Sequence, residues 1–155
     1  DYVTKVARDG GGADTRNTRL DVRHRIRYKV GTTVKKALLA VENEYYWNNS
    51  NDARTDFYDS QVWKLTGSAN GNVTKQLYVS GSYAFERKNY EHRTVTGIDA
   101  EARYDDKTTL STSAIYTFND TWKVSPSLQF DHLASNESTG EYDNMKYAFT
   151  VTASF

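Results

Sequence analysis

The chain has 155 residues, which is enough for one domain with a sizeable core. Its 20 Lys and Arg residues balance its 20 Asp and Glu residues, and it contains no cysteine. The neutral charge argues against a nucleic-acid-binding domain, which is usually basic, and the lack of cysteine excludes disulfides and thiolate metal sites. No apolar run approaches the roughly 18 residues of a transmembrane helix.

The first clear element is a stretch of alternating residues, LDVRHRIRYKV, at positions 20–30. On one side stand Leu, Val, Ile and Tyr, with His24 among them. The other side carries Arg23, Arg25, Arg27 and Lys29. Side chains of a β-strand point alternately to its two faces, so this pattern predicts a strand with one apolar and one cationic face.

The same alternation recurs along most of the chain. We predict further strands at residues 2–7, 34–47, 57–69, 73–87, 108–118, 122–134 and 145–155. Short turns are expected at 31–33, 70–72 and 119–121, and long polar connections at 8–17, 48–56, 88–107 and 135–144. Within the last but one of these connections, residues 93–104 leave a ninth strand open as an alternative.

Long strands joined by alternating short and long connections are typical of transmembrane barrels. The predicted strands of about 11–14 residues also exceed the usual 5–6 residues of soluble sheets. We therefore expect an all-β fold, an antiparallel up-and-down transmembrane β-barrel of eight strands that occupies residues 1–155 as a single domain. Whether this domain is the C-terminal part of a larger barrel stays open.

The last predicted strand, MKYAFTVTASF, resembles the C-terminal signature of Gram-negative outer-membrane β-barrel proteins. That resemblance implies a place in the outer membrane, in contact with its lipid and lipopolysaccharide, and recognition by the barrel-assembly machinery during folding. The residues that carry the signature are Tyr147, Phe149, Val151 and Phe155. Residues 114–155 are also similar to the closing hairpins of porin-type barrels, including oligogalacturonate-specific porins.

If the apolar faces meet lipid, charged side chains fill the interior. These are Arg23, Arg25, Arg27, Lys29, Lys36, Lys64, Glu42, Glu44 and Glu86. An eight-stranded barrel has room only for side chains, so we expect a packed, ion-paired interior and a role as a membrane anchor that displays surface loops. In a wider barrel the same row would attract anions, which gives a small porin for anions or acidic oligosaccharides as the first alternative. A soluble all-β carbohydrate-binding domain is the second.

We expect neither a metal, a cofactor nor a catalytic residue, and no nucleic-acid partner; the oligomeric state is left open. His24, His92 and His132 are scattered along the sequence and show no ligand-like spacing. One enzymatic alternative comes from small outer-membrane lipid A deacylases, which resemble this chain in size and carry a His-x-Ser pair. Here His132 and Ser135 are three positions apart, so a regular strand would point them to opposite faces.

Overall fold

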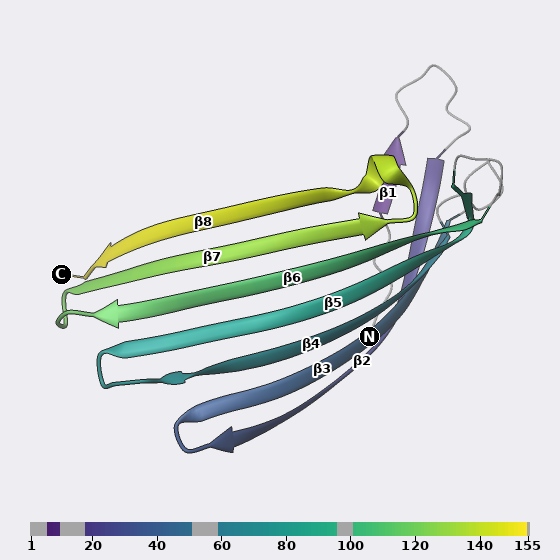
Figure 1. Cartoon of the computed structure of the whole chain (residues 1–155). Helices are drawn as coiled ribbons and strands as arrows, with labels where there is room; N and C mark the ends of the chain where they lie inside the picture. Colours follow the sequence, from purple (N-terminus) through teal and green to yellow (C-terminus); the bar gives the residue numbers. More distant parts are fainter. Residues whose placement is uncertain (1–5, 10–17, 51–58, 96–100, 155) are drawn as a thin grey trace.

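The computed structural model describes residues 6–9, 18–50, 59–95 and 101–154 of the chain. They form one antiparallel sheet in which every strand pairs with its neighbours in sequence (Figure 1). The strands are β1 (Val6–Asp9), β2 (Thr18–Val34), β3 (Ala37–Ser50), β4 (Ser60–Asn72), β5 (Leu77–Thr94), β6 (Ala102–Thr117), β7 (Trp122–Ser135) and β8 (Tyr142–Ala153), with a 3-10 turn, η1 (Ser138–Gly140), before the last. The all-β, antiparallel up-and-down prediction is confirmed.

The turns that join β2 to β3, β4 to β5 and β6 to β7 lie at one end of the sheet, here called the turn end, and the opposite ends of these strands form the loop end (Figure 1). The predicted turn at 119–121 is confirmed. Asn119 fixes it, because its side-chain oxygen accepts hydrogen bonds from the backbone N–H groups of Thr121 and Trp122, at 3.0 and 2.9 Å.

The other two predicted turns were placed too early. Strand β2 runs through 31–33 and reverses at Lys35, which has a left-handed φ of 55°. Strand β4 runs through 70–72, and the chain reverses over 73–76, where the Thr74 hydroxyl accepts hydrogen bonds from the backbone of Gln76 and Leu77. Gly31, Asn70 and Gly71 belong to residue types that favour turns, but here they lie within ladders.

At the loop end the strands are longer than predicted. Residues 88–107 are not one connection, because β5 continues to Thr94 and β6 begins at Ala102. The alternative ninth strand at 93–104 is therefore divided between these two strands. Residues 1–5, 10–17, 51–58 and 96–100 lie outside the described part of the chain.

Strand register keeps two faces separate from β2 to β8, apart from an irregularity in β5 between Asn89 and Thr94. Arg27 lies opposite Glu44, Glu44 opposite Lys64, and the same face continues through β5 to β8. We call this the charged face. The residues that alternate with these along each strand form the apolar face, where Val30 lies opposite Val41.

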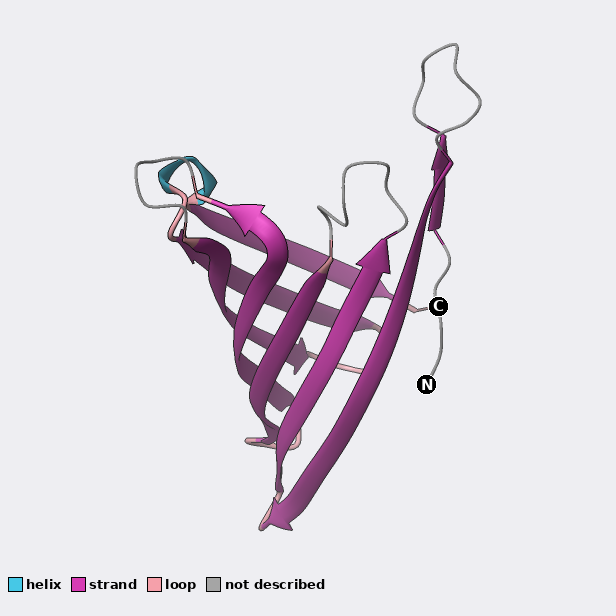
Figure 2. Cartoon of the chain, turned by 90° about the vertical axis from the view of Figure 1, so that its right-hand side faces the viewer, coloured by secondary structure: helices cyan, strands magenta, loops and turns pink. Residues whose placement is uncertain are grey.

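The sheet is bent and open. Figure 2 shows that the sheet is curled, and no pairing joins β1 to β8 among the described residues, so a closed barrel is not observed. The concave side of the sheet is called the trough. The buried residues in these ranges are Ala40, Ser60, Val62, Asp105 and Asp131. Register places them all on the charged face, which is therefore the concave side. No helix in the described ranges is long and apolar enough to span a membrane.

Gly71 provides a test of how closely β4 approaches the turn between β2 and β3. A β-carbon added there would overlap the backbone carbonyl oxygen of Lys36 and lie 2.9 Å from the Cα atom of Ala37. We expect Gly71→Ala to lower the free energy of unfolding by about 1–3 kcal/mol, because the backbone of the turn would have to move. Denaturant titration followed by tryptophan fluorescence measures this.

Gly67→Ala is the matched control on the same strand, since a β-carbon there meets no atom within 4 Å. Its effect on the free energy of unfolding should stay within about 0.5 kcal/mol. Equal losses in the two variants would contradict the close approach at Gly71.

Candidate functional site: the charged face of the sheet

The cationic row of β2 meets carboxylates on β3. The Nε atom of Arg25 lies 3.4 Å from Oε1 of Glu44. Glu42 receives two cations, with Arg27 Nη1 at 3.8 Å and Lys29 Nζ at 3.9 Å. The structure therefore brings together the Arg and Glu residues that the sequence placed on one face.

The ladder continues into β4 and β5, where Lys64 Nζ lies 4.0 Å from Glu86 Oε2. Lys36 does not join this ladder, because it lies in the turn between β2 and β3. The Arg27 and Lys29 side chains are 54% and 58% exposed, so their ion pairs face water in the trough. Pairs of this kind contribute little stability, typically below about 1 kcal/mol each.

Positive charge dominates the charged face. Among the side chains that the structure describes, the cations that the register and ion pairs place there are Arg23, Arg25, Arg27, Lys29, Lys64, Lys88, Arg103, Lys107, Lys123 and Lys146, against the acidic residues Glu42, Glu44, Glu86, Asp105 and Asp131. Since the whole chain is neutral, the trough is more positive than the rest of the molecule. Such a surface raises the local concentration of anions.

Asp131 organises the middle of the trough. Its side chain is 3% exposed and accepts hydrogen bonds from Thr109 at 2.7 Å and Gln129 at 2.9 Å. Lys107 and Lys146 each place Nζ 3.8 Å from one of its oxygens. One carboxylate thus holds two lysines from different strands.

Towards the turn end of β4 to β8, the face changes to small polar side chains around a hollow of about 370 Å³, among them Ser80, Ser82, Ser111 and Ser113.

At the loop end of the trough, cationic side chains lie over aromatic rings. The guanidinium of Arg23 lies 4.8 Å from the ring centre of Tyr46. Three further cations surround Tyr90, with Lys88 at 4.4 Å, Arg93 at 4.9 Å and Arg103 at 5.1 Å from its ring centre. Cation–π contacts hold these charges in place without neutralising them.

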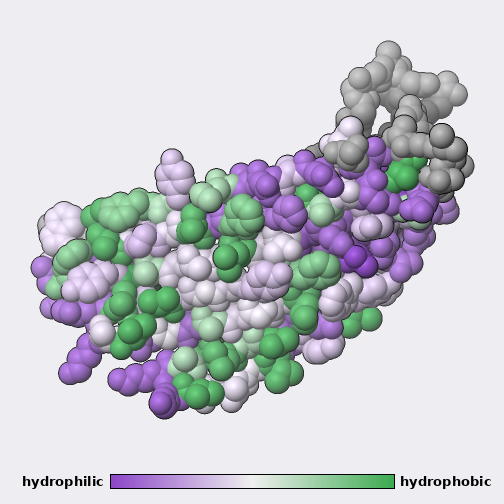
Figure 3. Space-filling model, viewed as in Figure 1, coloured by the Kyte–Doolittle hydropathy of each residue, from purple (hydrophilic) through white to green (hydrophobic). Residues whose placement is uncertain are grey.

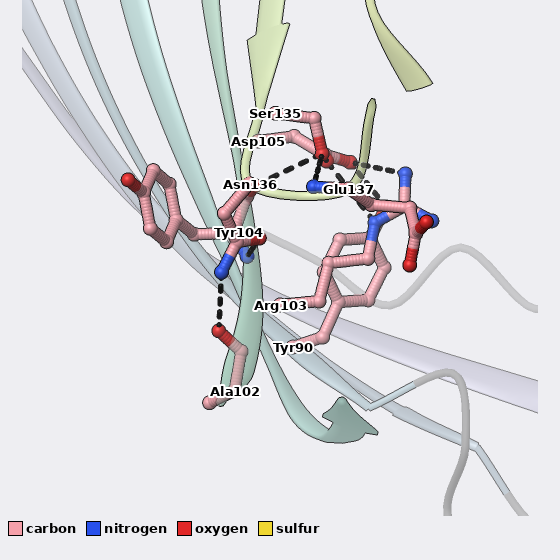
Figure 4. A network of polar contacts seen from close by, with 8 residues as sticks. All are labelled: Tyr90, Ala102, Arg103, Tyr104, Asp105, Ser135, Asn136 and Glu137. Atoms are coloured by element: carbon pink, nitrogen blue, oxygen red, sulfur yellow. Dashed lines mark hydrogen bonds and ion pairs between the residues drawn. The ribbon is translucent and has the colours of Figure 1, made fainter. Parts of the chain in front are cut away.

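Asp105 is the anchor of this end (Figure 4). It is 7% exposed and accepts hydrogen bonds from Ser135 at 2.6 Å, from Tyr90 at 2.8 Å and from Arg103 at 3.1 and 3.2 Å. Burial alone would raise the pKa of Asp105, but the hydrogen bonds from Ser135, Arg103 and Tyr90 outweigh it and hold the pKa below its ordinary value. Burial, together with the bond to Asp105, raises the pKa of Tyr90 to about 12.

The geometry separates His132 from Ser135. His132 Nδ1 lies 2.7 Å from Asp143 Oδ1 on the apolar face, in register with Thr108. Ser135 lies on the charged face, in register with Asp105, to which its hydroxyl donates. His132 and Ser135 therefore do not form a hydrogen-bonded pair in this structure.

The apolar face carries an uncharged belt. On β5 to β8 its segments span nine residues each, and every residue that they place on this face is uncharged: 77–85, 110–118, 122–130 and 145–153. Tyr147, Phe149 and Val151 lie in the last segment and are exposed, while Phe155 is outside the described residues. Figure 3 shows hydrophobic side chains gathered over the turn-end part of the sheet and hydrophilic ones towards the loop end.

Charge returns abruptly on the loop side of this belt. Arg87 Nε donates to Asp106 Oδ1 at 2.7 Å, next to the His132–Asp143 pair. His24, which had no role in the sequence pattern, stacks on Trp47 with ring centres 5.1 Å apart and planes at 21°. The uncharged belt of the apolar face therefore ends, on its loop side, at the Arg87–Asp106 and His132–Asp143 pairs.

Asp105→Asn tests the loop-end anchor. We expect it to lower the free energy of unfolding at pH 7 by about 1.5–3 kcal/mol, because three donors lose a charged acceptor. Asp106→Asn is the control from the neighbouring position: its partner Arg87 is exposed, so the loss should stay below about 1 kcal/mol. Denaturant titration measures both values.

The pH dependence of the unfolding free energy gives a second test of the role of Asp105. Because the pKa of Asp105 is lowered in the folded state, its contribution is complete above the ordinary Asp value of about 3.9 and is lost as the pH falls through the lowered value. The difference in unfolding free energy between wild type and Asp105→Asn should therefore shrink below about pH 4. A difference that stays constant down to pH 3 would contradict this account.

Comparison with known proteins returns no relative. No protein-family model, curated protein or solved structure matches the chain significantly.

Proposed function

We propose that the chain forms wall strands of an outer-membrane β-barrel in a Gram-negative bacterium, and that its charged face lines a water-filled passage for anionic solutes. The observation that carries the proposal is the separation of an uncharged belt from a cationic trough along the same strands. In water such a belt would leave large apolar side chains exposed, as Phe149 is at 68%.

The size of the belt fits a bilayer. Nine residues at a rise of about 3.4 Å, tilted by about 40°, span roughly 20–25 Å along the membrane normal, close to the lipid-facing band of about 25 Å in transmembrane barrels. The Arg87–Asp106 and His132–Asp143 pairs would then lie at the level of the lipid headgroups and of lipopolysaccharide. Tyr147, Phe149 and Val151 on the edge strand β8 would be available to the barrel-assembly machinery.

The open sheet favours a passage wider than a closed eight-stranded barrel allows. A closed barrel of that size is filled by its own side chains, whereas here Arg27 and Lys29 are more than half exposed. Further strands pairing with the free edges of β1 and β8 would complete such a wall. Acidic oligosaccharides suit the trough, since its arginines would bind their carboxylates.

A second candidate is the membrane anchor with a packed interior. The ion pairs Arg25–Glu44 and Lys64–Glu86 favour it, because closure of the sheet would press these groups together and let them seal the centre. The two candidates differ in whether ions pass through the folded protein.

Placement of the apolar face in lipid is tested by Leu128→Arg. In a bilayer this substitution should destabilise the protein by about 2–4 kcal/mol and reduce the fraction that migrates as a compact species on an unboiled detergent gel. Ser127→Arg is the matched control, because Ser127 is the preceding residue of β7 on the charged face. Equal tolerance of both substitutions, in a protein that stays monomeric in detergent-free buffer, would instead support a soluble domain.

Conduction is tested in planar bilayers. We expect steady, anion-selective current steps from the wild-type protein, and a several-fold lower anion-to-cation permeability ratio when Arg23, Arg25 and Arg27 are all replaced by Gln. Lys35→Gln, in the turn between β2 and β3, is the control and should leave the ratio unchanged. Folded, inserted protein that gives no current would contradict the passage and favour the anchor.

A further inference from the structure

A cluster of metal-binding groups lies at the loop end, outside the charged trough. Asp59, Glu91 and His92 each place a possible ligand atom so that all three lie within 4.8 Å of one another. The cluster combines one imidazole nitrogen with two carboxylates, which distinguishes it from a group of acidic residues alone. We propose that these residues bind a first-row divalent cation, with Zn²⁺ as the preferred ion.

Strand pairing brings the ligands together from two elements. Asp59 immediately precedes β4, and its carbonyl oxygen accepts a hydrogen bond of 3.2 Å from the backbone N–H of Glu91 on β5. The register of β5 against β6 is irregular between Asn89 and Thr94. In a regular strand Glu91 and His92 would point to opposite faces, so this irregularity is what lets both neighbours approach Asp59.

A supporting layer of hydrogen bonds orients one ligand. Gln61 Nε2 donates to Glu91 Oε1 at 2.9 Å, and the Tyr45 hydroxyl donates to Gln61 Oε1 at 2.8 Å. Partners of this kind fix the orientation of metal ligands and are a regular part of protein metal sites. Glu91 Oε2 has no part in the bond from Gln61 and can turn towards a cation.

The distances and ligand types select the ion. Ligands at about 2.0–2.1 Å from a tetrahedral Zn²⁺ lie about 3.4 Å apart, so the three side chains need to close by about 1 Å or slightly more. Glu91 and His92 are exposed, which leaves room for this movement and for water to complete the coordination. Imidazole nitrogen favours Zn²⁺ over Mg²⁺, which prefers oxygen ligands in an octahedron.

Direct titration with ZnCl₂ tests the proposal. The full chain, free of any histidine tag, is titrated calorimetrically in a non-chelating detergent buffer at constant pH. We expect saturable binding of one Zn²⁺ per chain that excess Mg²⁺ does not displace. His92→Asn and Asp59→Asn should each weaken the affinity at least tenfold, and Co²⁺ bound at the site should lose its visible absorption bands in His92→Asn.

The molecule supplies its own control. His132 also lies beside a carboxylate, at 2.7 Å from Asp143, but the described residues provide no third ligand there. His132→Asn should leave Zn²⁺ affinity unchanged. The proposal is overturned by the lack of saturable Zn²⁺ binding up to about 1 mM, or by an affinity that survives both His92→Asn and Asp59→Asn in folded protein.

Discussion

The backbone register between neighbouring strands is the constraint on which the rest of this structure depends. Side chains alternate along each strand, and an antiparallel ladder carries that alternation across to the next strand. From β2 to β8 the register preserves it, except in the part of β5 beyond Asn89, so Arg27 meets Glu44 on one face while Val30 meets Val41 on the other. A slip of a single residue between any two strands would place charge among the apolar side chains.

Charge is used in two ways within this frame. In the trough, pairs such as Lys29–Glu42 remain in contact with water, so they define the electrostatic character of the face more than its stability. Asp105 and Asp131 are buried, and each accepts several hydrogen bonds, some of them from neighbouring strands. These two carboxylates therefore hold neighbouring strands together, and the exposed pairs leave the surface free to attract solutes.

Much of this arrangement could be predicted from sequence, because alternation is a local property. The faces of β2, β7 and β8 follow directly from it, and so does the separation of His132 from Ser135. The turn at 119–121 could be predicted, but the other two turns could not, since Gly31 and Gly71 carry the residue type of a turn but lie within ladders. Only the three-dimensional pairing shows that Lys35 adopts the left-handed conformation.

Other features depend on residues far apart in sequence. The bond between Asp105 and Ser135 spans 30 positions, and neither residue belongs to a recognisable motif. The approach of Asp59 to His92 requires both the β4–β5 register and an irregularity in β5. Whether the sheet closes is equally non-local, because closure depends on what pairs with the edge strands β1 and β8.

The close approach at Gly71 determines which of two alignments of β3 against β4 can form, a choice that the alternation of side chains does not make. A shift of β3 against β4 by two residues would keep every side chain on its proper face, so hydrophobicity hardly distinguishes the two alignments. Such a shift would set Ala69 or Val73, in place of Gly71, opposite Ala37. A β-carbon at that point would overlap the Lys36 carbonyl oxygen. Only the alignment that places a glycine, Gly71, opposite Ala37 avoids this overlap.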